Sequence, residues 1–436
     1  MKLTRDVVKN ISNIKEEPEW MLKFRLKSLE AFEKSMNPNF GPKINIDYDS
    51  INYYKSRENK LTNNWDNISC EVRNIFDDLG VISAEKKFLD GVGAQYDSEV
   101  IYHNMVKELQ EKKVIFLDTD TALKKHPEIF KKYFNTLVKY NENKFTALNG
   151  AVWSGGTFIY IPPNTKLERP LQSYFRINSK NMGQFERTLI IVDDNSSLHY
   201  IEGCTAPTYT EDSLHAATVE IFVGKNSRCR YTTIQNWSND VYNLVTKRAI
   251  VEENGLMEWI DGNIGSKVNM KYPCCILKGK GARGSCITVA AASAGQIQDS
   301  GAKMIHLGEN TKSNIVSKSI ASKGGIATYR GKVKITRGAK NSSASVKCDT
   351  LILDEISKSD TVPTNIVNNN SSFLEHEATV SKISEDKLFY LMSKGIDEDS
   401  AKELIIMGFI GAFREELPME YAVELNRLLS LNIGGK

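Results

Sequence analysis

Residues 187–192 (RTLIIV), 218–223 (TVEIFV) and 229–237 (CRYTTIQNW) are short runs of β-branched and aromatic residues, each interrupted before it reaches helix length. Similar runs continue from about Gly155 to Asn370. Turns of Asn or Gly followed by a small residue recur at intervals of about 30 residues, at Asn195-Ser196, Asn226-Ser227, Asn254-Gly255, Gly284-Ser285, Asn310-Thr311 and Asn341-Ser342. This period predicts a β-solenoid, whose stacked coils bury one another's inner faces. The alternative, a β-sandwich, should lack the long-range period.

The segment before the solenoid, residues 1–150, is predicted to be mostly helical. Apolar residues recur at helical spacing between Trp20 and Phe32. Glu99–Gln110 and His126–Tyr140 are further helix candidates, and Val114–Leu117 is expected to form a short strand.

Helical spacing returns after Ser384. Asp397 is a candidate first residue of a second helix, and Pro418 of a third. We therefore divide the chain into an α-rich region (1–150), a β-helix core (151–372) and a helical domain (373–436) that covers the strand edges at the end of the solenoid.

The composition gives no reason to expect a nucleic-acid or membrane partner. Lys and Arg total 57 against 54 Asp and Glu, a net charge of +3, which is too small an excess for an anionic polymer or lipid surface. The amino terminus lacks an apolar signal core, and the longest apolar stretch, Leu404–Phe413, is too short to span a bilayer. We expect a cytoplasmic protein whose seven cysteines are reduced thiols.

Two glycine-rich motifs do not support nucleotide chemistry. Gly279–Gly284 matches GxGxxG, but strand-like residues follow it where a dinucleotide site needs a helix. Gly325–Lys332 has the wrong spacing for a P-loop. No nucleophile motif stands beside any of the six histidines. We expect that any ATP is hydrolysed by a partner.

Polar residues alternate along two of the predicted strands. Arg176 and Asn178 share one strand face, and Gln235 and Trp237 share a face of another strand. Such a face is either solvated or lines the interior of the solenoid. In the second case Arg176 and Lys247 would stabilise an anionic sulfur species.

Cys348 is a candidate metal ligand. The residues Glu375, His376 and Glu377 follow it by about one solenoid period, and residues one period apart can stack in adjacent coils. A thiolate with a neighbouring carboxylate or imidazole suits iron. The alternatives are a buried inert thiol and a solvated acidic turn.

The chain resembles the SufB members of the SufB/SufD family, which act in the SUF system of iron–sulfur cluster assembly. Blocks that carry the resemblance run in order from about Glu16 (EEPEWMLKFRL) to the carboxyl end, among them FERTLIIVDDNSSLHYIEGCTAP, YTTIQNW, GAKMIHLGENTKSNIVSKSI and LEHEATVSKISEDKLFYLMSKGI. The resemblance implies a right-handed parallel β-helix flanked by amino-terminal and carboxyl-terminal helical regions.

The resemblance also implies a scaffold rather than an enzyme, on which persulfide sulfur and iron form a nascent cluster of the 4Fe–4S type. The implied partners are a SufC-type ABC ATPase docked on the carboxyl-terminal helices, a SufD-type paralogue or a second copy paired through the β-helices, and a cysteine desulfurase with its sulfur-transfer protein. Whether a reduced flavin binds the complex is left open.

The resemblance assigns roles to individual positions. It makes Cys204, in EGCTAP, the sulfur acceptor, and it places Arg176, Asn178, Gln235, Trp237 and Lys247 along an internal sulfur path. Cys348 becomes the cysteine at the subunit interface, with Glu377 as co-ligand and with Glu375 and His376 beside it. Because neighbouring residues of a strand point to opposite faces, His376 and Glu377 cannot both reach one metal, and we expect Glu377 to be the ligand.

The chain departs from the family pattern at one place. Where several members carry a CxxCxxxC cluster in the amino-terminal region, this chain has SRENKLTNNWDNISC and only Cys70. Two other functions remain as alternatives. A SufD-like structural paralogue would lack reactive cysteines, and a β-helix carbohydrate-active enzyme would need paired carboxylates in a cleft.

Overall fold

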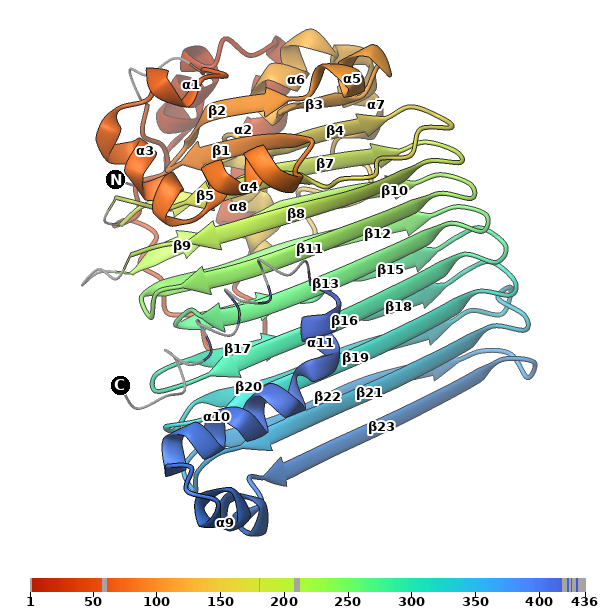
Figure 1. Cartoon of the computed structure of the whole chain (residues 1–436). Helices are drawn as coiled ribbons and strands as arrows, with labels where there is room; N and C mark the ends of the chain where they lie inside the picture. The colour runs from red at the N-terminus through yellow and green to blue at the C-terminus, as the bar shows by residue number, and fades with distance from the viewer. Residues whose placement is uncertain are drawn as a thin grey trace.

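The middle of the chain winds into a parallel β-solenoid made of two facing sheets (Figure 1), which confirms the prediction from the turn period. The computed structural model describes residues 2–56, 61–179, 181–207 and 212–417 and positions 422, 425 and 429. The first sheet contains β2 (Glu99–Met105), β1 (Gly91–Tyr96), β5 (Leu171–Arg176), β8 (Ser197–Thr205), β11 (Arg228–Trp237), β13 (Leu256–Gly265), β16 (Arg283–Ala292), β19 (Lys312–Ala321), β21 (Ser343–Ile352) and β23 (Phe373–Lys382), in this order.

The second sheet faces the first across the interior. Its path contains β14 (Val268–Lys271), β17 (Ile297–Ser300), β20 (Ile326–Ile335), β18 (Lys303–His306), β15 (Cys274–Leu277), β12 (Val241–Val251), β10 (Thr218–Val223), β7 (Arg187–Val192), β4 (Thr157–Ile161) and β3 (Ile115–Asp118). Beside this path, β22 (Lys358–Val367) pairs with β20, and β6 (Gly183–Gln184) pairs with β9 (Ser213–His215).

The asparagine turns stack at one corner of the solenoid. All five predicted Asn positions adopt the left-handed backbone conformation, with φ between 54° and 57°, which asparagine tolerates better than most residues. The Asn226 side chain donates to Asn195 Oδ1 (3.1 Å), and Asn195 donates in turn to Asn164 Oδ1 (3.0 Å). The prediction of a turn at Gly284-Ser285 is wrong: these residues lie in β16, and Gly281 (φ 69°) occupies the left-handed position of that coil.

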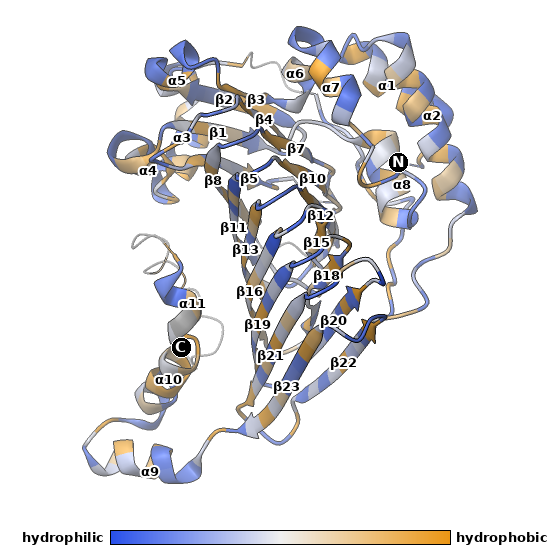
Figure 2. Ribbon diagram, turned by 90° about the vertical axis from the view of Figure 1, so that its right-hand side faces the viewer, coloured by the Kyte–Doolittle hydropathy of each residue, from blue (hydrophilic) through white to orange (hydrophobic). Residues whose placement is uncertain are grey.

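The amino-terminal region caps the first coils and covers part of the second sheet (Figures 1 and 2). Its helices are α1 (Arg5–Ile14), α2 (Glu19–Lys34), the 3-10 helix η1 (Trp65–Asn67), α3 (Cys70–Asp78), α4 (Val81–Phe88), α5 (Lys107–Glu111), α6 (Thr119–Lys125), α7 (Pro127–Tyr133) and α8 (Lys144–Val152). The expected strand at Val114–Leu117 is confirmed as β3, one residue later.

Two helix predictions in this region need correction. Residues 99–105 form β2, which pairs with β1 in a hairpin, and the helix α5 begins only at Lys107. The β-branched and aromatic residues of β2, such as Val100 and Tyr102, favour a paired strand over a helix. The helix expected over His126–Tyr140 ends at Tyr133.

The carboxyl-terminal helices α9 (Glu385–Ser393), α10 (Glu398–Phe409) and α11 (Gly411–Glu415) lie on the opposite side of the solenoid (Figure 2). Ile406, Ile410 and Phe413 pack against the outer face of the first sheet. The domain boundary expected at residue 373 falls at the first residue of β23, which still belongs to the solenoid because it pairs with β21. The helix expected from Pro418 falls mostly outside the described residues. No helix in the described part of the chain has the length and apolar character needed to cross a membrane.

The two ends of the solenoid differ. The first coils are covered by the amino-terminal helices, whereas β22 and β23 are exposed along most of their length. Phe373 (61% exposed) and Val380 (53% exposed) lie on this last coil. The expected helical cover over this end is therefore wrong for the described residues, because α10 and α11 pack on the outer face of the first sheet instead. Within the described part of the chain, the carboxyl-terminal end of the solenoid is an open sheet edge.

Candidate functional site

Cys204 lies near the end of β8, and its side chain faces the interior, where it is 1% exposed. Phe175, Cys204 and Gln235 occupy one register position in three successive coils. The Cys204 thiol donates to Glu202 Oε1 (3.8 Å), and Gln235 Nε2 donates to Cys204 Sγ (3.8 Å). The predicted acceptor and Gln235 are therefore in direct contact.

Two lysines and an aspartate are buried beside this thiol. Lys247 Nζ lies 2.8 Å from Thr233 Oγ1 and 3.4 Å from Asp261 Oδ1. Lys271 Nζ lies 3.3 Å from the same Asp261 oxygen and 3.1 Å from Gln235 Oε1. Burial alone would raise the pKa of Asp261, but the two lysines hold it below its ordinary value. Burial lowers the pKa of Lys271 to about 8.

Glu202 connects the thiol to these charges. The Tyr231 hydroxyl donates to Glu202, and Lys247 Nζ lies 4.0 Å from Glu202 Oε1. Burial, and next the neighbouring Glu202, raise the pKa of the Cys204 thiol well above its ordinary value. The thiol is therefore neutral at rest. It has a carboxylate in position to take its proton and cations nearby to stabilise an anionic sulfur.

A second buried pair lies next to Gln235. The His215 imidazole hydrogen-bonds Glu186 and, at 2.6 Å, Asn243 Oδ1, and its ring centroid lies 4.7 Å from that of Trp237. Burial would lower the pKa of His215, but Glu186 raises it. Asn243 donates to Gln235 Oε1 (2.8 Å) and so joins this pair to the network around Cys204. Trp237, predicted to line the interior, does so.

Arg176 and Asn178 lie elsewhere. In β5 the interior position is Phe175, so the next residue, Arg176, points to the outer face of the sheet. Asn178 follows the end of β5, and its backbone N–H donates to Asp97 Oδ1 (2.6 Å). The structure therefore brings Gln235, Trp237 and Lys247 together with Cys204, but not the Arg176 side chain.

Cys348 faces the interior from β21, near the open end. Its Sγ lies 3.5 Å from His376 Nε2 on β23. The pairing of Lys347 with Glu377 places that carboxylate on the outer face, where it is 63% exposed and lies 3.3 Å from Lys347 Nζ. One chain therefore places His376, and not the Glu377 side chain, beside the thiol. The choice of Glu377 as ligand stays a prediction that rests on the family resemblance.

The surroundings of Cys348 are half open. Burial, and next Asp349, raise the pKa of its thiol to about 11, and burial lowers the pKa of His376. Glu375 accepts a hydrogen bond from Ser345 (2.7 Å), which is an exposed contact. Within the described residues, no three His, Cys, Asp or Glu side chains lie close enough together to hold a metal ion.

A column of polar side chains runs from Glu202, beside Cys204, to Cys348. Strand pairing places six interior side chains at one register position in successive coils, namely Glu202, Thr233, Asp261, Thr288, Ser317 and Cys348. The Thr288 hydroxyl donates to Ser317 Oγ (3.0 Å). At a strand spacing of about 4.8 Å, the five steps from Glu202 to Cys348 span roughly 24 Å.

The sequence prediction missed Glu202, Asp261 and Lys271. The first two could have been found by aligning the repeats, because polar residues fall there at the register position of Cys348 in successive coils. Lys271 gave no such signal, since it lies in the short strand β14 of the second sheet.

The chain matches two family models and close relatives over almost all of its length. Residues 175–409 match the model described as SUF system FeS cluster assembly, SufBD core domain, and residues 9–173 match the SufBD protein N-terminal region. An iron–sulfur cluster assembly SufBD family protein of Staphylococcus saprophyticus is 58% identical over 434 residues, covering 99% of this chain and 93% of the relative. A protein of the same description from Staphylococcus aureus strain MRSA252 is 59% identical with the same coverage.

Proposed function

Because the chain belongs to the SufB/SufD family of the SUF system for iron–sulfur cluster assembly, we propose that it is the SufB-type scaffold. In this proposal Cys204 accepts sulfur, and Cys348 holds the growing cluster. The protein works in the cytoplasm as an assembly platform without turnover chemistry of its own.

The polar column from Glu202 to Cys348 is the observation that carries this proposal. An interior that only stabilised the solenoid would be apolar, because a buried charge costs free energy unless it is paired. Here Lys247, Asp261 and Lys271 are kept in the interior along this column. A SufD-like structural paralogue would have no use for such a set of charges beside a buried thiol.

The chemistry at Cys204 follows from its contacts. The thiol passes its proton to Glu202, and the thiolate attacks the outer sulfur of a donor persulfide. The sulfur–sulfur bond of the donor breaks, and the departing donor thiolate takes the proton back from Glu202. The result is a persulfide on Cys204 and a free thiol on the donor. Lys247 and Lys271 stabilise the anionic sulfur while it stays in the interior.

At the other end, the cluster is cargo that forms where the last coil is open. Cys348 provides a thiolate once iron displaces its proton, and His376 or Glu377 provides a second ligand. Protein-bound clusters normally have four ligands, so the others come from a SufD-type paralogue or a second copy paired across β22 and β23. The exposed helix α9 and its neighbours provide a docking surface for a SufC-type ATPase, which hydrolyses the ATP.

Anaerobic reconstitution of the purified complex with iron and a persulfide donor tests this proposal. We expect a sulfur-to-iron charge-transfer absorbance in the wild type and its loss in Cys348→Ala. Cys286→Ala is the matched control. It removes a buried interior thiol two residues before Thr288 of the polar column on the same strand. A Cys348→Ala complex that forms a cluster of normal yield and spectrum would rule out the assignment.

The same measurement separates the two co-ligand candidates. If the cluster forms inside the last coil, His376→Ala weakens the chromophore more than Glu377→Ala does. If the cluster forms outside the coil, between two chains, the order is reversed, since Glu377 lies on the outer face. Equal and unimpaired chromophores in both variants would remove both residues from the ligand set.

A further inference from the structure

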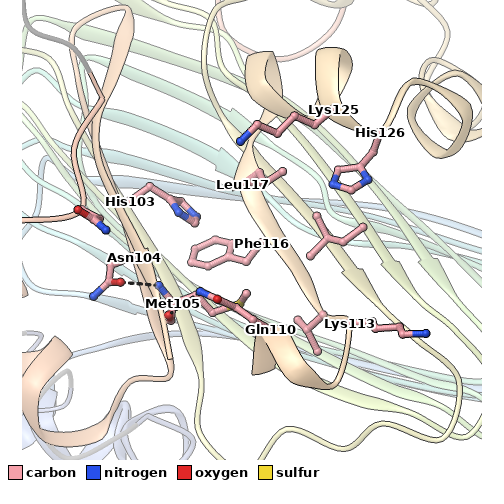
Figure 3. A pocket seen from close by; sticks show the side chains of 12 residues that line it. His103, Asn104, Met105, Gln110, Lys113, Phe116, Leu117, Lys125 and His126 are labelled. Atoms are coloured by element: carbon pink, nitrogen blue, oxygen red, sulfur yellow. Dashed lines mark hydrogen bonds between the residues drawn. The ribbon is translucent and has the colours of Figure 1, made fainter. Parts of the chain in front are cut away.

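The burial of Cys204 raises the question of how sulfur reaches it. Resting on the role proposed above for Cys204, we infer that a pocket at the capped end of the solenoid is the entrance for a small sulfur anion. This entrance pocket, of about 510 Å³, lies between β2, α5, β3 and the end of α6 (Figure 3). Its lining includes Asn63, His103, Asn104, Met105, Gln110 and the stretch 113–117, with Lys125 and His126.

The lining of the entrance pocket attracts anions. Lys113 and Lys125 lie on it, His126 is beside Lys125, and none of the twelve residues drawn in Figure 3 is a carboxylate. A concave site lined by one sign of charge raises the local concentration of the opposite ion. The entrance pocket therefore selects for small anions over neutral molecules or cations.

The inner wall of the pocket contains a ring nitrogen with no partner. The His103 ring lies against Phe116, with ring centroids 4.5 Å apart. Among the described residues, no group hydrogen-bonds the buried His103 Nε2. Burial, and next Lys125, lower the pKa of His103 to about 4, so the imidazole is neutral near pH 7. A neutral ring nitrogen can hydrogen-bond a passing anion without trapping it.

A second, smaller cavity lies behind this wall. It shares His103, Phe116 and Leu117 with the entrance pocket and has a volume of about 10 Å³, close to the room for one water molecule. Its lining includes the Asp118 carboxyl, whose pKa is raised by burial and next by Asp120. Its far side is formed by Ser173 and Phe175 inside the solenoid. The route therefore ends one strand away from Cys204.

Gly93 on β1 keeps this route open. A Cβ atom at this position would lie 3.2 Å from Ser173 Oγ and 3.8 Å from Phe116 Cζ. Ser173 in turn hydrogen-bonds Thr157 (2.7 Å), whose hydroxyl lies 2.9 Å from the Tyr200 hydroxyl. The hydroxyl groups of Ser173, Thr157 and Tyr200 therefore lie in a chain at the inner end of the route, beside the apolar side chains of Phe116 and Phe175.

The size and charge of the route define what it carries. A cavity of one water admits single atoms or short chains, so the folded donor protein stays outside. Hydrosulfide attacks the outer sulfur of the donor persulfide, the donor leaves as a thiol, and the hydropolysulfide anion HSS⁻ enters the pocket. At Cys204 this anion replaces the donor persulfide: its outer sulfur bonds to Cys204, its sulfur–sulfur bond breaks, and it leaves as hydrosulfide. Each transfer requires the buried Phe116 side chain and its neighbour His103 to rotate and widen the passage.

Two alkylating reagents of similar size test the route in the folded full-length chain. Iodoacetate is an anion and iodoacetamide is neutral, and mass spectrometry measures the modification rate of each cysteine. Both reagents attack the same thiolate, so the ratio of their rates cancels the pKa of the thiol. Cys348, at the opposite end of the solenoid, is an internal reference in every sample.

We expect the double variant Lys113→Glu, Lys125→Glu to lower the iodoacetate-to-iodoacetamide ratio at Cys204 by at least about threefold, as loss of electrostatic attraction predicts. The ratio at Cys348 stays unchanged. The control variant Lys280→Glu, Lys340→Glu makes the same charge change on exposed solenoid turns and leaves both ratios as they are. An unchanged ratio at Cys204 in the first variant would overturn the inference, as would a folded wild type in which neither reagent reaches Cys204.

A blocking variant gives a second reading. Gly93→Val fills the space beside Ser173 and should slow the modification of Cys204 by both reagents, while Cys348 reacts at its normal rate and so reports that the solenoid is intact. An unaltered Cys204 rate contradicts the route. The alkylation rates measure only how easily small molecules reach Cys204. They can therefore contradict the proposed route while Cys204 still accepts persulfide by another path. The loss of persulfide in Cys204→Ser tests the acceptor role separately.

Discussion

Each coil of the solenoid buries two unlike halves. Beside the asparagine turns the interior is apolar, as at Leu198, Cys229 and Met257, whereas four residues further along the same strands it holds Glu202, Thr233 and Asp261. Cys204 and Cys229 show what this difference means. Both thiols are buried, and burial raises the pKa of both. Only Cys204 has a proton acceptor and cations within reach, so its neighbours, and not its burial, suit it to sulfur chemistry.

The strongest test of the difference between the two halves is to remove one thiol from each half. Cys204→Ser should abolish persulfide loading after incubation with a persulfide donor, because no other interior thiol lies beside Glu202. Cys229→Ser should load as the wild type does. Mass spectrometry of the intact protein detects the added sulfur. Normal loading of Cys204→Ser would move the acceptor role to another cysteine.

Loss of a charge in the polar half should lower the unfolding free energy more than a change of side-chain shape in the apolar half. Asp261→Asn leaves Lys247 and Lys271 without their shared carboxylate, and breaking a buried ion pair costs about 3–5 kcal/mol of unfolding free energy. Met257→Leu in the apolar half keeps the volume and should cost less than about 1.5 kcal/mol. Urea denaturation monitored by circular dichroism measures both. Similar costs for the two variants would contradict the division of the interior.

A smaller effect is expected when the proton acceptor alone is changed. Glu202→Gln keeps the shape and the tyrosine hydrogen bond but cannot take the thiol proton, so persulfide loading of Cys204 should slow by about 10²-fold, the lower range for loss of a general base. The variant should regain speed as the pH rises, because hydroxide replaces the carboxylate. Glu258→Gln, on the outer face with Arg228 and Arg230, is the control. Equal loading rates in both variants exclude Glu202 as the base.

The smallest effect concerns a histidine in the apolar half. His306 hydrogen-bonds Thr311 and Ser313, and burial lowers its pKa to about 4. Its folded-state pKa lies below the unfolded value of about 6.5. Between these two pKa values the unfolded chain is protonated at His306 and the folded chain is not. The stability from this residue is therefore present above pH 6.5 and lost as the pH falls toward 4, by about 1–3 kcal/mol.

His306→Asn should flatten this part of the pH dependence. Thermal unfolding at pH 7 and pH 5 measures the difference between variant and wild type. An identical pH dependence in the two proteins would show that His306 titrates normally in the folded state.

The sequence was most informative where local chemistry determines the backbone. At the solenoid corner, asparagine followed by a small residue predicts a left-handed turn, and the structure confirms five such turns. The same pair at Asn149-Gly150 lies inside helix α8, so the repeat, and not the pair alone, identifies the turns. Gly284-Ser285 misled because Gly281, three residues earlier, meets the same requirement. The strand Glu99–Met105 was mistaken for a helix because its pairing with β1 involves residues that no local pattern connects.

The candidate site was less predictable because it depends on pairing between coils. The sequence could place Arg176 and Asn178 on one face, but not say that Phe175 faces inward and Arg176 outward. The contact of Cys348 with His376 depends on the register of β21 against β23, where a shift by one residue would bring Glu377 inward instead.

The contrast between a capped and an open end has a mechanical consequence. In the corner ladder, Asn195, Asn226 and Asn254 each donate a side-chain hydrogen bond to the coil before, and each coil pairs with its neighbours. A force applied to the carboxyl terminus would therefore first detach α10 and α11 from the first sheet and then remove β23 and the coils before it one at a time. The same force on the amino-terminal cap would have to separate several packed helices at once. The force needed to unfold the molecule would therefore differ between its two ends and would be larger at the amino-terminal end.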